Sequence, residues 1–419
     1  MNSVHTLYVC YFGLREPLVQ TQVVSYLRQL QSENLRVSLL TFEPRFNETW
    51  SADELERERA ALAADGITWH YLPYHKTPSL PATLYDIAAG TRKILGLMRR
   101  EGVSVLHARN HVPALMCAIA KRRLGARLVF DIRGFMPEEY TDAGVWPENG
   151  YLYRGLKRVE RYLLKSADAF VLLTEKARDI VFPQSGGSVA EGSEDQGRPI
   201  EVIPCCVDFE RFEKVATLSK DSLREELQLD GRRVIVYVGS FGGWYMTDEM
   251  TEFLSVAHQQ DPSTFSMILT QSPKQMVVER LSGLGIAEQD FVVTQVGPGE
   301  VPRYLKAADI AISFIKPCYS KQSSSPTKMA EYLASGLPIV CNAGVGDLDK
   351  LIVDNRAGAL LREFTPKGYV EALNEIEQLR AEENLAERLR EVARREFDLV
   401  GVGRKRYRRL YERLLNNVR

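Results

Sequence analysis

Residues 323–340, "SSSPTKMAEYLASGLPIV", have the pattern of a loop, a short helix and a strand, and they place a lysine where a helix disfavours one. Ser325 can cap free backbone N–H groups, and Pro326 suits the first helical position. Lys328 would then be the third helical residue, where the helix terminus repels a cation by about 0.3–1 kcal/mol. A bound anion would remove that repulsion, so the stretch predicts a phosphate site. The alternative is a lysine that bends into solvent.

The surrounding sequence makes this helix part of a strand, helix, strand unit. It follows the strand "DIAISFI" and the loop "KPCYSKQSSS", and a Ser335-Gly336 stop ends it before the next strand. Lys328 and Glu331 are three residues apart and therefore share a helix face. A cation for phosphate and a carboxylate for sugar hydroxyls indicate a nucleotide-sugar site. The alternative is a surface Glu–Lys pair that contributes only a few tenths of a kcal/mol.

Length and composition indicate a globular protein with two domains. The 419 residues exceed a single ordinary core, and a net charge of −1 argues against nucleic-acid binding through charge. No apolar run approaches a membrane span, and the start "MNSVHTLYVCYFG" is more typical of a first strand than of a signal peptide. We therefore expect a cytoplasmic protein. The six cysteines include no C-x-x-C pair, so no metal site is expected.

Short apolar runs alternate with amphipathic stretches along the whole chain, which predicts parallel sheets covered by helices. This α/β pattern occurs twice. The predicted strands of the first series are 7–12, 37–41, 103–108, 128–132, 169–173 and 200–203, and those of the second are 234–238, 266–269, 291–294, 310–314 and 338–341.

The polar segment "CCVDFERFEKVATLSKDS" separates the two series, so we place a domain boundary near Phe212. The predicted domains are 1–212 and 213–395, each a doubly wound Rossmann-like fold, with 396–419 as a C-terminal helix that crosses back. Two such domains facing one another would form a cleft, into which the carboxyl ends of the strands open. Residues 184–199, "QSGGSVAEGSEDQGRP", have too little apolar content to pack and are predicted to be a mobile loop.

Two helical stretches carry basic residues that could attract nucleic acid or an anionic membrane. In the last helix an apolar stripe at i, i+3, i+4 and i+7 favours docking by one face, with the charged side chains in water. The stripe comprises Tyr407, Leu410, Tyr411 and Leu414. The basic residues of this helix are Arg404, Lys405, Arg406, Arg408 and Arg409. For residues 151–165, weak attraction to a membrane surface is the alternative to ordinary docking; the basic residues there are Arg154, Lys157, Arg158, Arg161 and Lys165.

The stretch "SSSPTKMAEYLASGLPIVCNAGVGDLDKLI" resembles the donor-binding signature of the retaining glycosyltransferases of family 4, which have the GT-B fold of two Rossmann-like domains. Agreement extends over most of the chain. The supporting stretches are "GLREPLVQTQVVSYLRQL", "VLHARNHVPAL", "DIRGFMPEEYTDAGVW", "KSADAFVLLTE", "VIPCCVDFERF" and "AADIAISF".

The resemblance assigns roles to particular residues of the donor site. Glu331 matches the second glutamate of the family's Glu, seven residues, Glu motif, which binds the ribose diol. Ser323 stands where the first glutamate would meet the donor sugar, so the chain departs from the family pattern at this position. The expected donor-binding residues are Gly239, Ser240, Gly242, Gly243, Val296, Ser323, Ser324, Ser325, Pro326, Thr327 and Glu331.

The glycine-rich segment "GSFGGWY", residues 239–245, also departs from the family pattern. Many members carry an arginine directly after the first glycine and a lysine a few residues on, and both hold the diphosphate. Here glycines would let backbone N–H groups approach the diphosphate, but the loop supplies no positive charge. Lys328 is the best-placed substitute. The alternative for the glycines is a plain strand-to-helix turn.

The N-terminal domain is expected to bind the acceptor, because polar residues follow three of its predicted strands. The candidate acceptor or sugar residues are Gly13, Arg15, Glu16, His107, Asp131 and Glu138. Family members often show His-x-His where this chain has His107-Ala-Arg109, so Arg109 or His111 would replace the second histidine. The alternative is that a single histidine at a strand end has a structural role and takes no part in catalysis. The predicted catalytic residues are Lys328, Arg109, His111 and Arg133.

The resemblance implies transfer of a sugar from a nucleoside diphosphate sugar to an acceptor hydroxyl, with retention at the anomeric carbon and with no cofactor or metal. Similar proteins act on carbohydrate or lipid-linked acceptors in surface-polysaccharide or oligosaccharide synthesis. Two alternatives stay open. One is a degenerate transferase that binds nucleotide or a partner without turnover, and the other is a dinucleotide-dependent oxidoreductase, which the absence of G-x-G-x-x-G disfavours.

Overall fold

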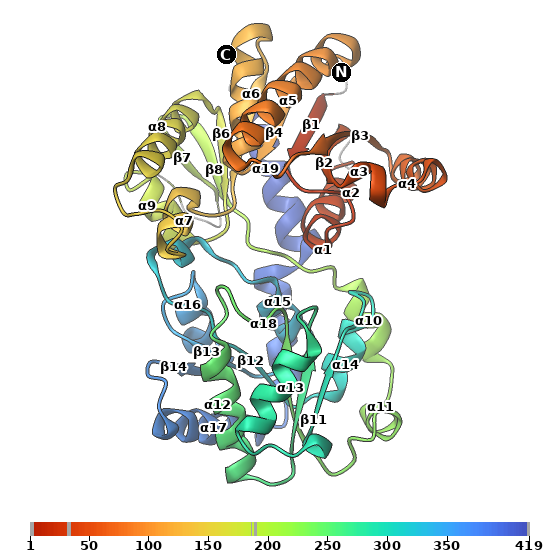
Figure 1. Ribbon diagram of the computed structural model, residues 1–419, viewed down its shortest axis with the longest axis vertical. Coiled ribbons are helices and arrows are strands. Elements are labelled where there is room, and N and C mark those ends of the chain that lie inside the picture. Colours follow the sequence, from red (N-terminus) through yellow and green to blue (C-terminus); the bar gives the residue numbers. More distant parts are fainter. Residues whose placement is uncertain (1–3, 32–34, 186, 188–190, 417–419) are drawn as a thin grey trace. The chain divides into compact units, whose positions relative to one another are not determined.

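The computed structural model (Figure 1) describes residues 4–31, 35–185, 187 and 191–416. Contacts within the chain divide it into two compact units. The N-terminal unit reaches Pro204 and resumes at Val402, and the C-terminal unit extends from Cys205 to Gly401. The boundary predicted near Phe212 therefore falls inside the C-terminal unit, and the chain re-enters the N-terminal unit at Val402 instead of residue 396.

The N-terminal unit contains an eight-stranded sheet in which only the last pair is antiparallel. In sheet order its strands are β3 (Ile67–Tyr74), β2 (Arg36–Pro44), β1 (His5–Cys10), β4 (Val105–Arg109), β5 (Arg127–Ile132), β6 (Ala169–Leu172), β8 (Arg198–Val202) and β7 (Ser193–Asp195). Parallel central strands need cover on both faces. Strand β1 accordingly contains six consecutive buried residues.

The helices of the N-terminal unit cover this sheet (Figure 1). Four of them, α5, α6, α8 and α9, contribute side chains to one apolar core with the central strands. The helices are α1 (Pro17–Val19), α2 (Ser25–Gln31), α3 (Phe46–Thr49), α4 (Ala52–Ala64), α5 (Ser79–Glu101), α6 (His111–Leu124), α7 (Met136–Asp142), α8 (Tyr151–Ser166), α9 (Glu175–Val181) and α19 (Lys405–Asn416).

Part of the segment predicted as a mobile loop is a β-hairpin. Strand β7 pairs with β8 in antiparallel register, and Arg413 donates a hydrogen bond to the carbonyl oxygen of Ser193 at 2.9 Å. Backbone pairing and this contact hold the hairpin despite its low apolar content. Residues 186 and 188–190 of the predicted loop lie outside the described residues.

The C-terminal unit contains a six-stranded parallel sheet, which confirms the prediction of two doubly wound domains. In sheet order its strands are β11 (Phe291–Thr294), β10 (Thr264–Leu269), β9 (Arg233–Val238), β12 (Ile310–Ser313), β13 (Ile339–Asn342) and β14 (Gly358–Leu361). Its helices are α10 (Glu210–Ala216), α11 (Lys220–Glu226), α12 (Thr247–Gln260), α13 (Lys274–Gly283), α14 (Val301–Ala307), α15 (Thr327–Ala334), α16 (Leu348–Asp354), α17 (Pro366–Arg380) and α18 (Leu385–Phe397).

The last helix, α19, belongs to the N-terminal unit, as the fold prediction expected. Its apolar stripe is buried, with Tyr407, Leu410, Tyr411 and Leu414 each at most 2% exposed. Charges on its other side are partly paired within the unit, since Arg409 forms an ion pair with Glu201 of β8. Docking by one face is therefore confirmed for this helix. Among the described residues, no helix is both long and apolar enough to span a bilayer.

Candidate active site

The candidate donor site lies in the C-terminal unit, at the carboxyl ends of β9 and β12. The loop after β9 pairs with the loop after β12, because Met246 N–H donates to the Phe314 carbonyl oxygen and Lys316 N–H donates to that of Trp244. An isolated antiparallel bridge joins Tyr245 to Ile315. These backbone contacts fix the aromatic side chain of Tyr245 beside the loop that leads to α15.

Helix α15 begins one residue later than the sequence predicts. Pro326 occupies the N-cap position in an extended conformation, and Thr327 is the first helical residue. Ser325 does not cap the helix, because its hydroxyl oxygen accepts a hydrogen bond from the Cys205 N–H at 3.1 Å. Lys328 is therefore the second helical residue, still in the first turn where a cation is unfavourable.

Lys328 is buried between two aromatic rings. Its Nζ lies 3.9 Å from the Tyr245 ring centroid and 4.4 Å from that of Tyr237, and it donates to the Tyr237 hydroxyl at 3.3 Å. Among the described residues no carboxylate lies within ion-pair distance of it. Burial lowers the pKa of Lys328 to about 7, against the opposing field of Glu331. The rings hold the amine partly by cation–π attraction, but they do not neutralise it.

Gly239 makes room for this amine. A Cβ atom at residue 239 would lie 2.5 Å from Lys328 Nζ, and the backbone there has φ +142°. Any side chain would therefore displace the lysine. Farther along the loop, the Gly242 N–H already donates to the Thr247 hydroxyl at 2.8 Å and the Phe241 N–H to Ser272 at 2.9 Å. The absence of a side chain at Gly239 therefore leaves space for the Lys328 amine, whether or not a ligand also approaches the backbone there.

Glu331 lies one turn beyond Lys328 and faces Arg211 of α10. Arg211 Nη1 is 3.6 Å from Glu331 Oε1, and the same guanidinium donates to the Pro298 carbonyl oxygen in the loop after β11. Burial raises the pKa of Glu331, while Arg211 and Lys328 oppose that rise. The carboxylate is thus paired with Arg211 and lies in the field of Lys328, and both of its oxygens can accept further hydrogen bonds.

The N-terminal unit gathers several predicted acceptor residues into one buried network. Asp131 forms an ion pair with Arg133 at 2.7 Å and accepts a hydrogen bond from Tyr8 at 3.0 Å. The Arg133 guanidinium also donates to Tyr407 of α19 at 2.8 Å. Burial would raise the pKa of Asp131, but Arg133 and His107 hold it below its ordinary value. This network ties the C-terminal helix to the sheet.

Arg109 stands out in that network because it has no partner. Its side chain ends β4 and is 4% exposed, yet its buried Nη1 makes no hydrogen bond within the described residues. His107, two residues earlier on the same strand, shares a hydrogen bond with Tyr411 at 3.0 Å. A buried guanidinium N–H without an acceptor is costly, so Arg109 is the member of this network best suited to a ligand.

Other predicted residues of the N-terminal unit form two further groups. His111 begins α6 and contacts Glu160 of α8 at 3.1 Å, and Lys157 bridges Glu160 to Glu138. At the other end of the sheet, exposed Arg15 pairs with Glu54 at 2.9 Å, next to exposed Glu16. The structure therefore does not bring all predicted acceptor residues into one contact group.

Gly13 is a close-approach position. A Cβ there would lie 2.7 Å from Pro44 Cδ and 2.9 Å from Glu43 Oε2. The buried Glu43 carboxylate accepts hydrogen bonds from the Leu14 N–H at 2.9 Å and from the Trp50 indole at 3.2 Å. Sequence analysis missed Glu43, although it follows a predicted strand in the manner of the other candidates.

Two family models match the chain, one for each unit. Residues 19–189 match the glycosyl transferase 4-like domain, and residues 219–396 match the glycosyl transferases group 1. The chain belongs to the group 1 glycosyltransferases. No curated protein matches this glycosyltransferase in sequence.

Solved structures share the fold of this glycosyltransferase over nearly its whole length. Sucrose-phosphate synthase from Thermosynechococcus elongatus is 13% identical, covers 99% of this chain and 100% of its own, and has a TM-score of 0.73. HepE from Anabaena, solved with UDP and glucose, is 15% identical over 98% and 100%, with a TM-score of 0.66. WaaG, involved in lipopolysaccharide biosynthesis, is 16% identical over 96% and 98%, with a TM-score of 0.65.

The remaining predicted donor residues of the glycosyltransferase differ in how deeply they are buried. Ser323 is 2% exposed, and its hydroxyl donates to the Ser320 carbonyl oxygen at 2.7 Å. Val296 packs against the core, and the Ser240 carbonyl oxygen accepts from the Tyr237 hydroxyl at 2.6 Å. Ser324 and Gly243 are not buried.

Sequence reasoning missed three contributors to this site. Arg211 lies in the quoted segment "VIPCCVDFERF", so the resemblance contained a signal for it. Tyr237 and Tyr245 carried no such signal, because their role depends on where the Lys328 side chain turns. Among the described residues, no group of three or more His, Cys, Asp or Glu side chains could hold a metal ion.

Proposed function

We propose that this glycosyltransferase moves a sugar from a nucleoside diphosphate sugar to an acceptor hydroxyl with retention at the anomeric carbon. The observation that carries this proposal is the buried Lys328 in the first turn of α15, which has no carboxylate partner in the part of the chain that the structure describes. Desolvating an unpaired ammonium is expensive. A diphosphate at the helix terminus would supply the missing negative charge and interact with both the amine and the helix dipole.

The chemistry follows from where charge grows during the reaction. When the bond between the sugar and the diphosphate breaks, negative charge accumulates on the departing phosphate oxygens. Lys328 and the N–H groups at the start of α15 are already oriented, so they stabilise this charge without reorganising. We therefore assign leaving-group stabilisation to Lys328, and we expect turnover to survive EDTA.

We assign the ribose hydroxyls to Glu331. Its carboxylate is held by Arg211 at 3.6 Å, a distance that leaves its oxygens capacity for two hydroxyl donors. Arg211 also reaches the Pro298 carbonyl and so connects the loop after β11 to this carboxylate. Ser323, buried and bonded to a backbone carbonyl, offers no charge toward the donor sugar where the family's first glutamate would.

We assign the acceptor to the N-terminal unit, with Arg109 as its principal contact. The predicted roles of His111 and Arg133 stay proposals, and both side chains are already engaged, by Glu160 and Asp131 respectively. Arg109, in contrast, forms no hydrogen bond or ion pair within the described residues, and its buried Nη1 lacks an acceptor. An acceptor that offers hydroxyl, phosphate or carboxylate oxygens would satisfy it.

We propose UDP as the nucleotide of the donor, and a surface polysaccharide or lipid-linked oligosaccharide as the product. Support comes from two relatives in fold, HepE, solved with UDP and glucose, and WaaG, involved in lipopolysaccharide biosynthesis. Weak contact with a membrane would bring the enzyme to a lipid-linked acceptor. Helix α8 suits such contact, because Tyr151 is 94% exposed and Leu152 51% exposed beside its basic residues.

A thermal-shift screen with UDP, GDP, ADP, CMP and NAD, alone and as sugar conjugates, tests the proposal. A ligand at 100 times its dissociation constant adds about 2.7 kcal/mol to the free energy of unfolding, which shifts the melting temperature measurably. We expect one nucleoside diphosphate to stabilise the protein and NAD to have no effect. A response to NAD alone would overturn the proposal, and stabilisation without donor hydrolysis or transfer would favour the degenerate alternative.

A further inference from the structure

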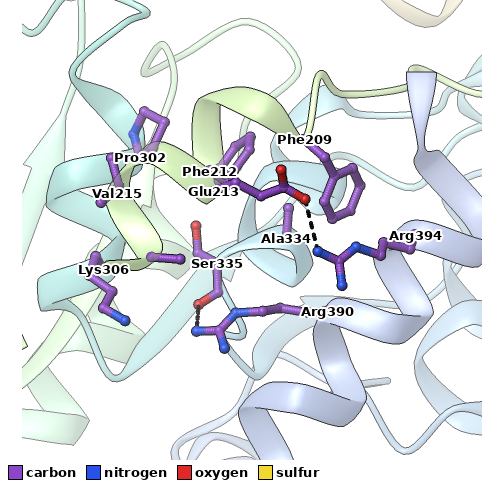
Figure 2. A pocket seen from close by; sticks show the side chains of 11 residues that line it. Phe209, Phe212, Glu213, Val215, Pro302, Lys306, Ala334, Ser335, Arg390 and Arg394 are labelled. Atoms are coloured by element: carbon purple, nitrogen blue, oxygen red, sulfur yellow. Dashed lines mark hydrogen bonds and ion pairs between the residues drawn. The ribbon is translucent and has the colours of Figure 1, made fainter. Parts of the chain in front are cut away.

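A small cavity lies in the C-terminal unit, at the other end of α15 from Lys328. It has a volume of about 50 Å³ and opens between α10, α14 and α18. Figure 2 shows Arg390 and Arg394 reaching into it from α18, with Lys306 approaching from α14. Its lining residues are Phe209, Phe212, Glu213, Val215, Ala216, Pro302, Lys306, Ala334, Ser335, Arg390 and Arg394.

Positive charge exceeds negative charge in this cavity. The three cations face a single carboxylate, Glu213, which pairs with Arg394 at 3.0 Å. Arg390 reaches only the Ser335 carbonyl oxygen, at 3.5 Å, and Lys306 has no hydrogen bond or ion pair within the described part of the chain. Two half-buried cations, Lys306 and Arg390, are therefore left beside each other with no carboxylate from the described residues to balance them.

Stabilisation by the carbonyl end of a helix does not fully account for the positive charge at Lys306. Lys306 lies in the last turn of α14, where helix carbonyl groups favour a positive charge. Burial nevertheless lowers the pKa of Lys306, and Arg390 and Lys220 lower it further. The net environment thus disfavours the ammonium. An anion between Lys306 and Arg390 would favour the charged form of Lys306. The apolar side chains of Phe209, Phe212 and Val215 exclude water from one side of such an anion.

We propose that this cavity binds a small phosphate-bearing anion between Lys306 and Arg390, and that its occupancy is linked to donor binding. Two elements carry the link. Helix α10 presents Phe212 to the cavity and the adjacent Arg211 to Glu331. At the C-cap of α15 the Ser335 hydroxyl, on the cavity wall, donates to the Glu331 backbone carbonyl at 3.0 Å. The link rests on the proposed role of Glu331, whereas the anion site does not.

The anion site is tested with inorganic phosphate by thermal shift and isothermal titration calorimetry. We expect phosphate to stabilise the wild type, and Lys306→Met or Arg390→Met to weaken its binding by at least about tenfold, as loss of one charged hydrogen bond implies. Lys306→Glu would place a carboxylate beside Arg390, so it should abolish phosphate binding and leave the protein folded. The matched control, Lys367→Met, removes a positive charge from a side chain that is 88% exposed, and it should bind phosphate normally.

Phosphate could instead bind at the donor site, so the same titration is repeated with Lys328→Met. Phosphate binding that persists in this variant supports the cavity. Binding that disappears in Lys328→Met, an unchanged affinity in Lys306→Met and Lys306→Glu, or the absence of any response in the wild type would overturn the site. The link requires that phosphate change the UDP dissociation constant in the wild type but not in Lys306→Met, and an equal change in both would refute the link alone.

Discussion

The two units handle buried charge in opposite ways. In the N-terminal unit Asp131 is surrounded by cations and hydroxyl groups, with Arg133 at 2.7 Å and Tyr8 at 3.0 Å. In the C-terminal unit Lys328 is buried to a similar degree, but its neighbours are two aromatic rings. The pKa values respond accordingly. The carboxyl keeps its charge with a lowered pKa, while the ammonium, with a pKa of about 7, is close to losing its own.

This difference separates a structural charge from one held ready for a ligand. Breaking a paired buried charge leaves the partner uncompensated and destabilises the fold, whereas removing an unpaired buried charge relieves a cost already present. Substitutions in the two clusters should therefore differ in kind, with lost stability in one and lost turnover in the other.

The largest effect is expected from Asp131→Asn. The substitution leaves Arg133 buried without a carboxylate, and removing one partner of a buried pair costs about 3–5 kcal/mol. Chemical denaturation monitored by circular dichroism measures the loss. The control is Glu54→Gln, which breaks the exposed ion pair with Arg15 and should change stability far less than Asp131→Asn. Equal, small effects of both substitutions would contradict the structural role of Asp131.

Lys328→Met should affect turnover and leave the fold intact. By analogy with the loss of one oxyanion donor, we expect the maximal rate to fall about a hundredfold to a thousandfold, with a smaller change in donor binding. Apo stability should stay constant or rise, because the repulsion from the helix terminus and the cost of burying the amine both disappear. Steady-state kinetics and denaturation of the same preparation measure both quantities. Full turnover together with a loss of several kcal/mol would show that the lysine is structural.

Glu331→Gln should have a smaller effect, mainly on the Michaelis constant. A ribose contact is equally present in the ground state and the transition state, so its loss weakens donor binding and leaves the maximal rate nearly unchanged. Initial rates over a range of donor concentrations separate the two parameters. A fall in maximal rate as large as that of Lys328→Met would move Glu331 from donor binding to catalysis.

The pH dependence of apo stability should carry a separate signature of Lys328. The lysine loses its proton near pH 7 in the folded state but near pH 10.5 in the unfolded chain. Between these values the unfolded state binds more protons, so the contribution of Lys328 makes stability rise with pH in this window. Denaturation between pH 7 and 10 should therefore show a steeper rise in the wild type than in Lys328→Met. Parallel curves would mean that the amine is not desolvated.

Strand runs and the α15 signature were predictable from sequence because they depend on local periodicity and short-range chemistry. Every predicted run overlaps an observed strand, but β3, β7 and β14 were missed. Strand β3 lies at a sheet edge and contains Pro73 and His70, which blur its pattern, and β7 has only three residues. Both form by pairing with a neighbouring strand.

Side-chain environments were less predictable than the backbone. The burial of Lys328 against Tyr237 depends on contacts between residues 91 positions apart. The same holds for His107 and Tyr411, which are 304 positions apart and meet only because α19 docks on the sheet. Ser325 shows that the hydrogen bond of even a single hydroxyl group can depend on tertiary contacts. Its hydroxyl could cap the helix on sequence grounds, but the Cys205 N–H is the donor that it accepts from in the fold.

The most direct test of the role of Lys328 is the proton stoichiometry of UDP binding at pH 8. A neutral Lys328 should regain its proton when the diphosphate binds, and the diphosphate itself is already fully ionised at this pH, since its last pKa is about 6. Calorimetric titrations in two buffers of different ionisation enthalpy give the number of protons taken up. We expect the wild type to take up close to one proton, about 0.9 at most if its pKa is about 7, and Lys328→Met to take up none. Binding of UDP by the wild type without proton uptake, or the same uptake in both proteins, would contradict the assignment of Lys328 to the diphosphate.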